Sequence, residues 1–360
     1  MKGGKMNVLP LSQPVDPGRW RALAAYLREA GYGTKALHEV LALDGPPEAI
    51  LADVARCSLI NLNRLAKQTS TLSITARLFL LCGAVPAREL VLLKPELREL
   101  LRELDLIRPD PRTPESVRAR VAITEYAGRY FCSDRLFENV GDGLDLRVSE
   151  GICMPLHASS LELLSTLRKR TPAESFLDVG CGTGCQAIVF AARYDKVLGF
   201  DINPRCTAYA SINSLMNKVP ATYQTCGWRD FHAEEPFQHV AFNAPDVATA
   251  FAFIADGCQR VLAPGGLAQV LTSFEVGARD GDASDAVRRR LRLPDGLELA
   301  EVAANADSPF ALSRRNVAEG RLPRNSLLVP NPSQRAGYLR SLAERGVVEV
   351  VSATLSLQRR

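Results

Sequence analysis

The sequence predicts an α/β protein in which a helical N-terminal domain precedes a doubly wound sheet. Helical patterns dominate before residue 117, and short apolar strands alternate with helical patterns after residue 160. Glycines at 180, 182 and 184 follow the first of those strands. Strands that alternate with helices favour a parallel sheet covered by helices. We expect the ligand of such a sheet to bind beyond the carboxyl ends of its strands.

Composition places the chain among ordinary soluble proteins. Its 360 residues are 46% hydrophobic and 23% charged, with a net charge of +4. This length allows two domains, and the charge is too small to indicate nucleic-acid binding without a local patch. No apolar run approaches the ~18–20 residues that span a bilayer. Nine scattered cysteines include no C-x-x-C pair, so we expect reduced thiols, no metal site and a cytoplasmic location.

The N-terminal part is predicted as a disordered arm over residues 1–16 and a helical domain over 17–116. Trp20, Leu23, Ala24 and Leu27 fall on one face of the first helix. Further helical patterns cover 34–43, 47–55, 61–66, 73–82 and 89–104, and Pro95 is expected to kink or restart the last of them. Basic residues are dispersed here, which favours a lid or a homodimer platform over a nucleic-acid-binding domain.

Residues 117–160 are predicted as a linker that contributes to the site. A strand pattern rich in aromatic residues covers 121–131 and includes Tyr130, and Phe137 and Asn139 follow before a glycine-containing turn at 141–143. Ser159 or Ser160 is expected to cap a helix over 161–167. His157 is interpreted as a structural hydrogen-bonding residue, with a role as catalytic base as the alternative.

A glycine-rich turn follows the buried strand pattern 175–179. Asp178 ends the run of strand residues, and the second strand, 196–201, ends in Asp201. A carboxylate at that strand end suits two ribose hydroxyls. The spacing is G-x-G-x-G rather than the G-x-G-x-x-G of dinucleotide sites, and Asp178 would repel a pyrophosphate. These features favour S-adenosylmethionine (SAM), which carries an ammonium group, over a dinucleotide.

The segment from Leu177 to Gly184, together with Asp201-Ile202-Asn203-Pro204, resembles the first two motifs of class I SAM-dependent methyltransferases. Nearly the whole chain is similar to bacterial two-domain proteins of the "small methyltransferase domain" group. This resemblance implies a Rossmann-like sheet over 161–360 behind a winged-helix-like N-terminal domain. It assigns cofactor contacts to Asp178, Gly180, Gly182, Gly184, Asp201, Ile202, Asn203, Gly227, Trp228 and Asn243.

The rest of the catalytic domain follows the same alternation of strands and helices. A helical pattern covers 207–217 and carries Asn213 and Asn217. The remaining strands are predicted at 221–226, 239–242, 267–274, 297–303 and 347–357. The remaining helices are predicted at 247–261 and 333–345, with an irregular segment at 306–330.

The loop after the fourth strand reads Asn243-Ala244-Pro245-Asp246. The resembled family carries Asn-Pro-Pro followed by an aromatic residue, which suits a planar NH₂ acceptor. The change to Ala244 and Asp246 disfavours a protein glutamine or a nucleic-acid base as the acceptor. It favours methylation of a small molecule in specialised, natural-product metabolism, with Asn243 or Asp246 orienting the nucleophile.

Two alternatives remain open. One is a SAM cyclase that resembles azetidine-2-carboxylate synthases, uses SAM as sole substrate and releases methylthioadenosine. Tyr130, Phe137 and Asn139 would line that site, with aromatic faces near the sulfonium. The other is a SAM-binding regulator without catalytic activity. We expect no membrane partner, and the dispersed charge does not favour a nucleic-acid partner.

Overall fold

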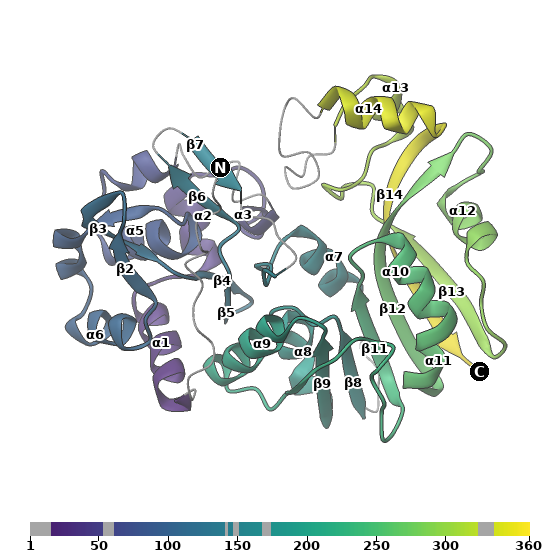
Figure 1. Cartoon of the computed structure of the whole chain (residues 1–360), viewed down its shortest axis with the longest axis horizontal. Coiled ribbons are helices and arrows are strands. Elements are labelled where there is room, and N and C mark those ends of the chain that lie inside the picture. The colour runs from purple at the N-terminus through teal and green to yellow at the C-terminus, as the bar shows by residue number, and fades with distance from the viewer. Residues whose placement is uncertain (1–15, 53–60, 141–142, 147–150, 168–173, 323–334) are drawn as a thin grey trace. The chain divides into compact units, whose positions relative to one another are not determined.

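The computed structural model describes residues 16–52, 61–140, 143–146, 151–167, 174–322 and 335–360 (Figure 1). They form two compact units that interleave along the chain. The first unit draws on 1–157, 182–189 and 203–220, and the second on 158–181, 190–202 and 221–360. The predicted arm 1–16 lies outside the described residues except for Asp16, whose side chain accepts a hydrogen bond from the Gly18 N–H and so caps the first helix.

The N-terminal part of the first unit is rich in helices, as predicted. The predicted apolar face, Trp20, Leu23, Ala24 and Leu27, is buried. Pro95 stands at the first position of α6, so the predicted restart is confirmed. Residues 61–65 are helical, and the other helical elements are α1 (Pro17–Glu29), α2 (Thr34–Leu41), α3 (Ala49–Ala52), α5 (Thr71–Thr75), the π-helix η1 (Ala76–Leu80), the 3₁₀-helix η2 (Ala87–Leu92), α6 (Pro95–Glu103), α8 (Cys185–Phe190) and α9 (Pro204–Asn217).

Short antiparallel strands also belong to the first unit. The strand predicted over 121–131 is two strands, because Ala127 (φ 52°) and Gly128 (φ 75°) form a tight turn between them. A three-stranded sheet has the order β1-β3-β2. The strands are β1 (Ala84–Pro86), β2 (Ile107–Asp110), β3 (Thr113–Ala119), β4 (Ala122–Tyr126), β5 (Arg129–Ser133), β6 (Phe137–Val140) and β7 (Gly143–Leu146).

The second unit contains a mixed seven-stranded sheet, which confirms the predicted α/β class. Its order is β10-β9-β8-β11-β12-β14-β13, parallel from β10 to β12, with β14 antiparallel to both neighbours. The strands are β8 (Ser175–Val179), β9 (Lys196–Asp201), β10 (Thr222–Thr225), β11 (Phe237–Asn243), β12 (Leu262–Gly277), β13 (Leu297–Ala304) and β14 (Val347–Arg359).

Helices of the second unit depart from prediction at three places. α7 begins at Ala158, so Ser159 and Ser160 lie inside its first turn and the predicted cap is wrong. α12 and α13 were not anticipated, and α13 falls in the segment expected to be irregular. The helical elements are α7 (Ala158–Thr166), η3 (Ala191–Arg193), α10 (Val247–Ala252), the π-helix η4 (Phe253–Gly257), α11 (Cys258–Val261), α12 (Ala283–Arg290), α13 (Arg314–Ala318) and α14 (Arg335–Glu344).

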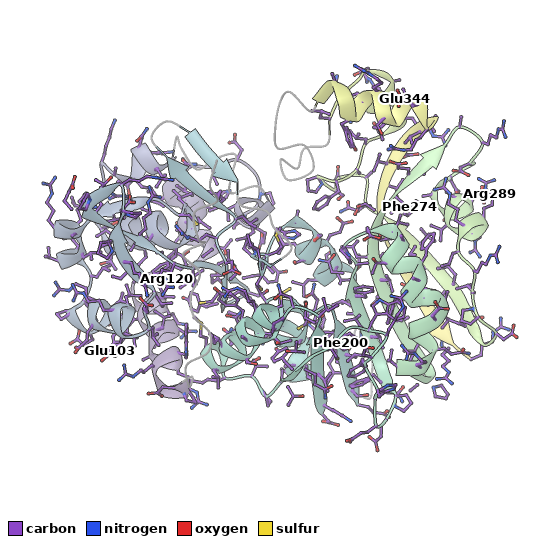
Figure 2. The ribbon with its side chains drawn as sticks, viewed as in Figure 1. Glu103, Arg120, Phe200, Phe274, Arg289 and Glu344 are labelled. Carbon is purple, nitrogen blue, oxygen red and sulfur yellow. The ribbon has the colours of Figure 1, made fainter. Side chains whose placement is uncertain are left out.

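Apolar side chains of the parallel strands form the core of the second unit. Phe200 on β9 and Phe274 on β12 both belong to it (Figure 2). The Phe200 ring stacks on Phe231 with centroids 4.4 Å apart, an arrangement that adds to the gain from burial. This core holds the carboxyl ends of the strands in fixed register. No helix within the described ranges is long and apolar enough to cross a membrane.

Candidate functional site

Three adjacent parallel strands of the second unit end at the same edge of the sheet. Val179 of β8 pairs in register with Phe200 of β9 on one side and Phe242 of β11 on the other. The next residues, Gly180, Asp201 and Asn243, therefore emerge side by side. Parallel strands present their ligand sites at this edge. The register thus brings together three of the predicted site residues.

The turn after β8 requires glycine at defined positions. Gly180, Gly182 and Gly184 have φ values of 60°, 52° and 75°, in the left-handed region that other residues rarely adopt. A Cβ on Gly180 would also lie 3.3 Å from the Phe242 ring, whereas one on Gly182 would meet open space. The Cys181 N–H donates to the Phe200 carbonyl at 2.9 Å. The predicted tight turn is confirmed, and its hydrogen bond from Cys181 attaches it to the backbone of β9.

Asp178 is buried within the sheet, with 2% of its surface exposed. Its register partners are Gly199 on β9 and Ala241 on β11, both small. A Cβ on Gly199 would come within about 3.0 Å of Tyr223 and Cys181, so this position has no room for a side chain. Sequence reasoning missed Gly199, although a glycine inside a strand pattern signals such a close approach.

The loop after β9 joins the predicted ribose site to α9. Asp201 is half-buried, and its carbonyl accepts a hydrogen bond from Cys226 N–H at 3.0 Å. Ile202 is 77% exposed, which is unusual for a large apolar side chain and suits contact with a ligand. Asn203 caps α9 by accepting from the Arg205 N–H at 3.0 Å. Asn203 thus has a structural role whether or not it contacts the cofactor.

The loop after β10 carries the predicted adenine contacts. The Gly227 carbonyl accepts hydrogen bonds from the N–H groups of Asp230 and Phe231, both at 3.0 Å. Trp228 is half-buried and packs edge-on against Phe253, with ring centroids 5.9 Å apart. The Arg229 guanidinium lies 4.1 Å from the Trp228 ring centroid. Packing accounts for this tryptophan, and its stacking on adenine stays a prediction.

The predicted acceptor loop has two well-defined polar side chains. Asn243 donates from Nδ2 to the Ser159 hydroxyl of α7 at 2.9 Å. Asp246 caps α10, where its carboxylate accepts from the N–H of Thr249 at 2.8 Å and from its hydroxyl at 3.0 Å. Asp246 is exposed. Sequence reasoning assigned Ser159 to a helix cap and missed its contact with Asn243, since nothing local in the sequence connects them.

The predicted linker residues lie in the first unit. The Tyr130 hydroxyl donates to the Tyr32 carbonyl at 2.9 Å, and burial raises the Tyr130 pKa to about 12. Phe137, the first residue of β6, is buried. Asn139 pairs with Leu144 in that hairpin, and its side chain lies outside the described part of the structure. Tyr130 is therefore explained by packing, and a role for these three residues at a sulfonium stays a prediction.

His157 and the cysteines are the remaining ionisable side chains considered for acid–base or nucleophilic chemistry. Desolvation lowers the pKa of His157 to about 4, so the imidazole is neutral at physiological pH. The described cysteines are free thiols, and all of them except Cys226 are buried. Burial raises the pKa of Cys258 to about 12, which makes its thiol unreactive.

Comparisons with known proteins agree with this geometry. Residues 176–266 match a family model described as "Methyltransferase domain". A release factor glutamine methyltransferase of Geobacter sulfurreducens is 26% identical over 110 residues, covering 30% of this chain and 39% of that protein. A dTDP-4-amino-2,3,4,6-tetradeoxy-D-glucose N,N-dimethyltransferase of Saccharopolyspora spinosa is 34% identical over 128 residues, covering 31% of this chain and 46% of that protein. The chain thus spans less than half the length of either relative.

Two solved structures align over more of the chain. A mycolic acid cyclopropane synthase in its apo form aligns over 57% of this chain and 91% of its own, at 17% identity and a TM-score of 0.38. A tRNA m1G37 methyltransferase of M. jannaschii aligns over 68% and 60%, at 13% identity and a TM-score of 0.40. Residues 176–266 are therefore similar to known methyltransferase domains, and this segment contains the strand ends at which the sequence predicts a SAM site.

Proposed function

We propose that the protein transfers the methyl group of SAM to a small-molecule acceptor in bacterial specialised metabolism. The observation that carries this proposal is the alignment of Gly180, Asp201 and Asn243 at the ends of three neighbouring strands. In this assignment the Asp201 carboxylate accepts hydrogen bonds from the ribose hydroxyls. In the same assignment, the backbone of the glycine turn lies against the amino acid part of SAM. The buried Asp178 carboxylate attracts the ammonium group of SAM.

Asn243 is the residue that we assign to the acceptor. Its Nδ2 is held by Ser159, so its Oδ1 is the end that remains to accept a hydrogen bond from an acceptor N–H or O–H. Methyl transfer needs an in-line approach of the nucleophile to the sulfonium, and fixing that geometry supplies much of the barrier reduction. A positioned amide is therefore sufficient, and no strong general base is required next to it.

The acceptor loop supports a small molecule over a planar amide or base. Asp246 stands where the resembled family has an aromatic ring, and this carboxylate is exposed and used as a helix cap. No stacking ring follows Asn243 in the loop. The sugar N,N-dimethyltransferase to which residues of this chain are similar acts, by its name, on a small amine. We therefore propose small amines or hydroxyl compounds as acceptors in preference to protein glutamine and nucleic-acid bases.

Product analysis tests this proposal. The protein is incubated with SAM alone and with SAM plus a panel of small amines, including nucleotide-linked amino sugars. We expect SAM alone to be stable and S-adenosylhomocysteine (SAH) to appear only with an acceptor. Methylthioadenosine from SAM alone would instead support the cyclase reaction, and SAH formed only with a protein or nucleic-acid acceptor would contradict the small-molecule assignment. Tight SAM binding with no product from any acceptor would favour a regulator.

A further inference from the structure

Two asparagines on α9 pair with one edge of strand β5 in the first unit. Asn217 accepts from the Tyr130 N–H at 2.9 Å and donates to the Tyr130 carbonyl at 2.7 Å. Asn213 accepts from the Cys132 N–H at 2.7 Å and donates to the Cys132 carbonyl at 3.0 Å. Each amide side chain therefore binds both backbone groups of one strand residue.

The spacing of this contact follows from helix and strand geometry. Residues four apart on a helix are separated by ~6 Å along its axis, and residues two apart on a strand by ~6.6 Å. A side-chain amide offers the same donor and acceptor as a peptide group. The β4–β5 register pairs Arg129 with Tyr126 across a two-residue turn, so Tyr130 and Cys132 present their backbone groups to the opposite edge. α9 thus satisfies an edge that would otherwise lack partners.

The third bond of each asparagine goes to a different partner. The Asn213 Nδ2 also donates to the carbonyl of Thr183, at 2.9 Å, inside the glycine-rich turn. The third bond of Asn217 goes instead to the Asn213 carbonyl within α9, at 2.8 Å. Asn213 is fully buried, so each of these bonds is made away from water and is costly to lose.

The bond to Thr183 fixes the direction of a peptide group in the turn. In a trans peptide the C=O and the following N–H point in opposite directions. The bond holds the Thr183 carbonyl towards Asn213 and therefore directs the Gly184 N–H away from Asn213. The glycines on both sides of Thr183 have positive φ and little intrinsic preference, so the turn depends on such external bonds for a single conformation.

We propose that Asn213 is a positioning residue for the SAM site, which ties the conformation of the glycine-rich turn to the β4–β5 hairpin. This inference rests on the proposed SAM-dependent function. The hairpin and the turn share one buried amide, so disturbing the hairpin edge at Cys132 changes the turn. Asn217 holds the same edge without touching the turn and is a matched control.

The test compares SAH binding to the full-length wild type, Asn213→Ala and Asn217→Ala by calorimetry, with thermal unfolding of each. Both variants lose two bonds to β5, so both should unfold at lower temperature. Only Asn213→Ala should weaken SAH binding, by about ten-fold or more, while Asn217→Ala should stay within about three-fold of the wild type. Asn213→Ser is measured alongside as a second variant, because its single, shorter hydroxyl cannot replace the three bonds of the amide. It should also weaken SAH binding.

Three results would overturn the inference. SAH affinity within about two-fold of the wild type in a folded Asn213→Ala or Asn213→Ser protein removes the positioning role. An equal loss of affinity in Asn217→Ala assigns the effect to general destabilisation. A wild-type protein that binds neither SAH nor SAM overturns the proposed function along with the inference, and this outcome is distinct because it is seen before any variant is compared.

Discussion

The Asn243 side chain at the end of β11 donates to the Ser159 hydroxyl in the first turn of α7, with 2.9 Å between Nδ2 and Oγ. The two residues are 84 positions apart in the sequence and belong to the same compact unit. The bond sets which end of the amide is available at the edge of the sheet. It makes Ser159 a positioning residue for the proposed acceptor contact.

Removing this hydroxyl should impair turnover without impairing cofactor binding. Ser159→Ala frees the amide of Asn243 to rotate, and loss of orientation lowers kcat by roughly ten-fold, with the affinity for SAM unchanged. Ser165→Ala is the control, since Ser165 is an exposed serine on the same helix. Steady-state kinetics with a responding acceptor provide the measurement. Equal kcat in the two variants would remove Ser159 from the site.

Asp246 should matter for stability through its cap. Asp246→Ala removes two bonds from the start of α10 and should lower the free energy of unfolding by about 1 kcal/mol, while Asp246→Ser should recover most of it. Denaturant unfolding measures this change. Asp282→Ala, which removes the cap of α12, is a matched stability control. If Asp246→Ser restores stability but not methyl transfer, the carboxylate itself orients the nucleophile, as predicted from the sequence.

His157 should make stability depend on pH in the acid range. Its pKa is about 4 in the folded protein against 6.5 when unperturbed, so the unfolded chain binds the extra proton. The stabilisation is fully present above about pH 6.5 and is lost as the pH falls towards 4. His157→Gln cannot titrate and should lack this loss. Denaturant unfolding between pH 7 and 4 gives the comparison, and parallel stability profiles for the two proteins would contradict it.

Local sequence signals predicted the sheet and the strand-end residues well. The glycines at 180, 182 and 184 do adopt positive φ, and Asp201 does end its strand, because these features depend on neighbours in the chain. The strands β2 and β3 were not predicted, because they contain Pro109 and Pro114, and proline is uncommon within strands. Pro109 lies on an edge strand, and Pro114 precedes the residues of β3 that pair with β1, so neither proline interrupts the pairing there.

Contacts between distant side chains could not be predicted. The sequence places Asn213 and Asn217 on one helix, but nothing in it indicates that they bind the backbone of β5. Ser159 was expected to cap a helix because its position near a helix start fits that role as well as it fits a bond to Asn243. The cap formed by Asp246 was missed, although Asp246-Val247-Ala248-Thr249 is a suitable helix start, because a carboxylate in this loop fits a chemical role as well as a cap.

Calorimetric titration of SAM into wild type, Asp201→Ala and Asp195→Ala tests the central claim most directly. Asp195 is an exposed carboxylate just before the amino end of the same strand, at the opposite end from Asp201. Replacing either residue by alanine changes the net charge equally. Each hydrogen bond to a charged group is worth roughly 1.5–3 kcal/mol, so Asp201→Ala should weaken SAM binding by about ten-fold or more. Asp195→Ala should leave it unchanged. Wild-type affinity in a folded Asp201→Ala protein would contradict the placement of SAM at these strand ends.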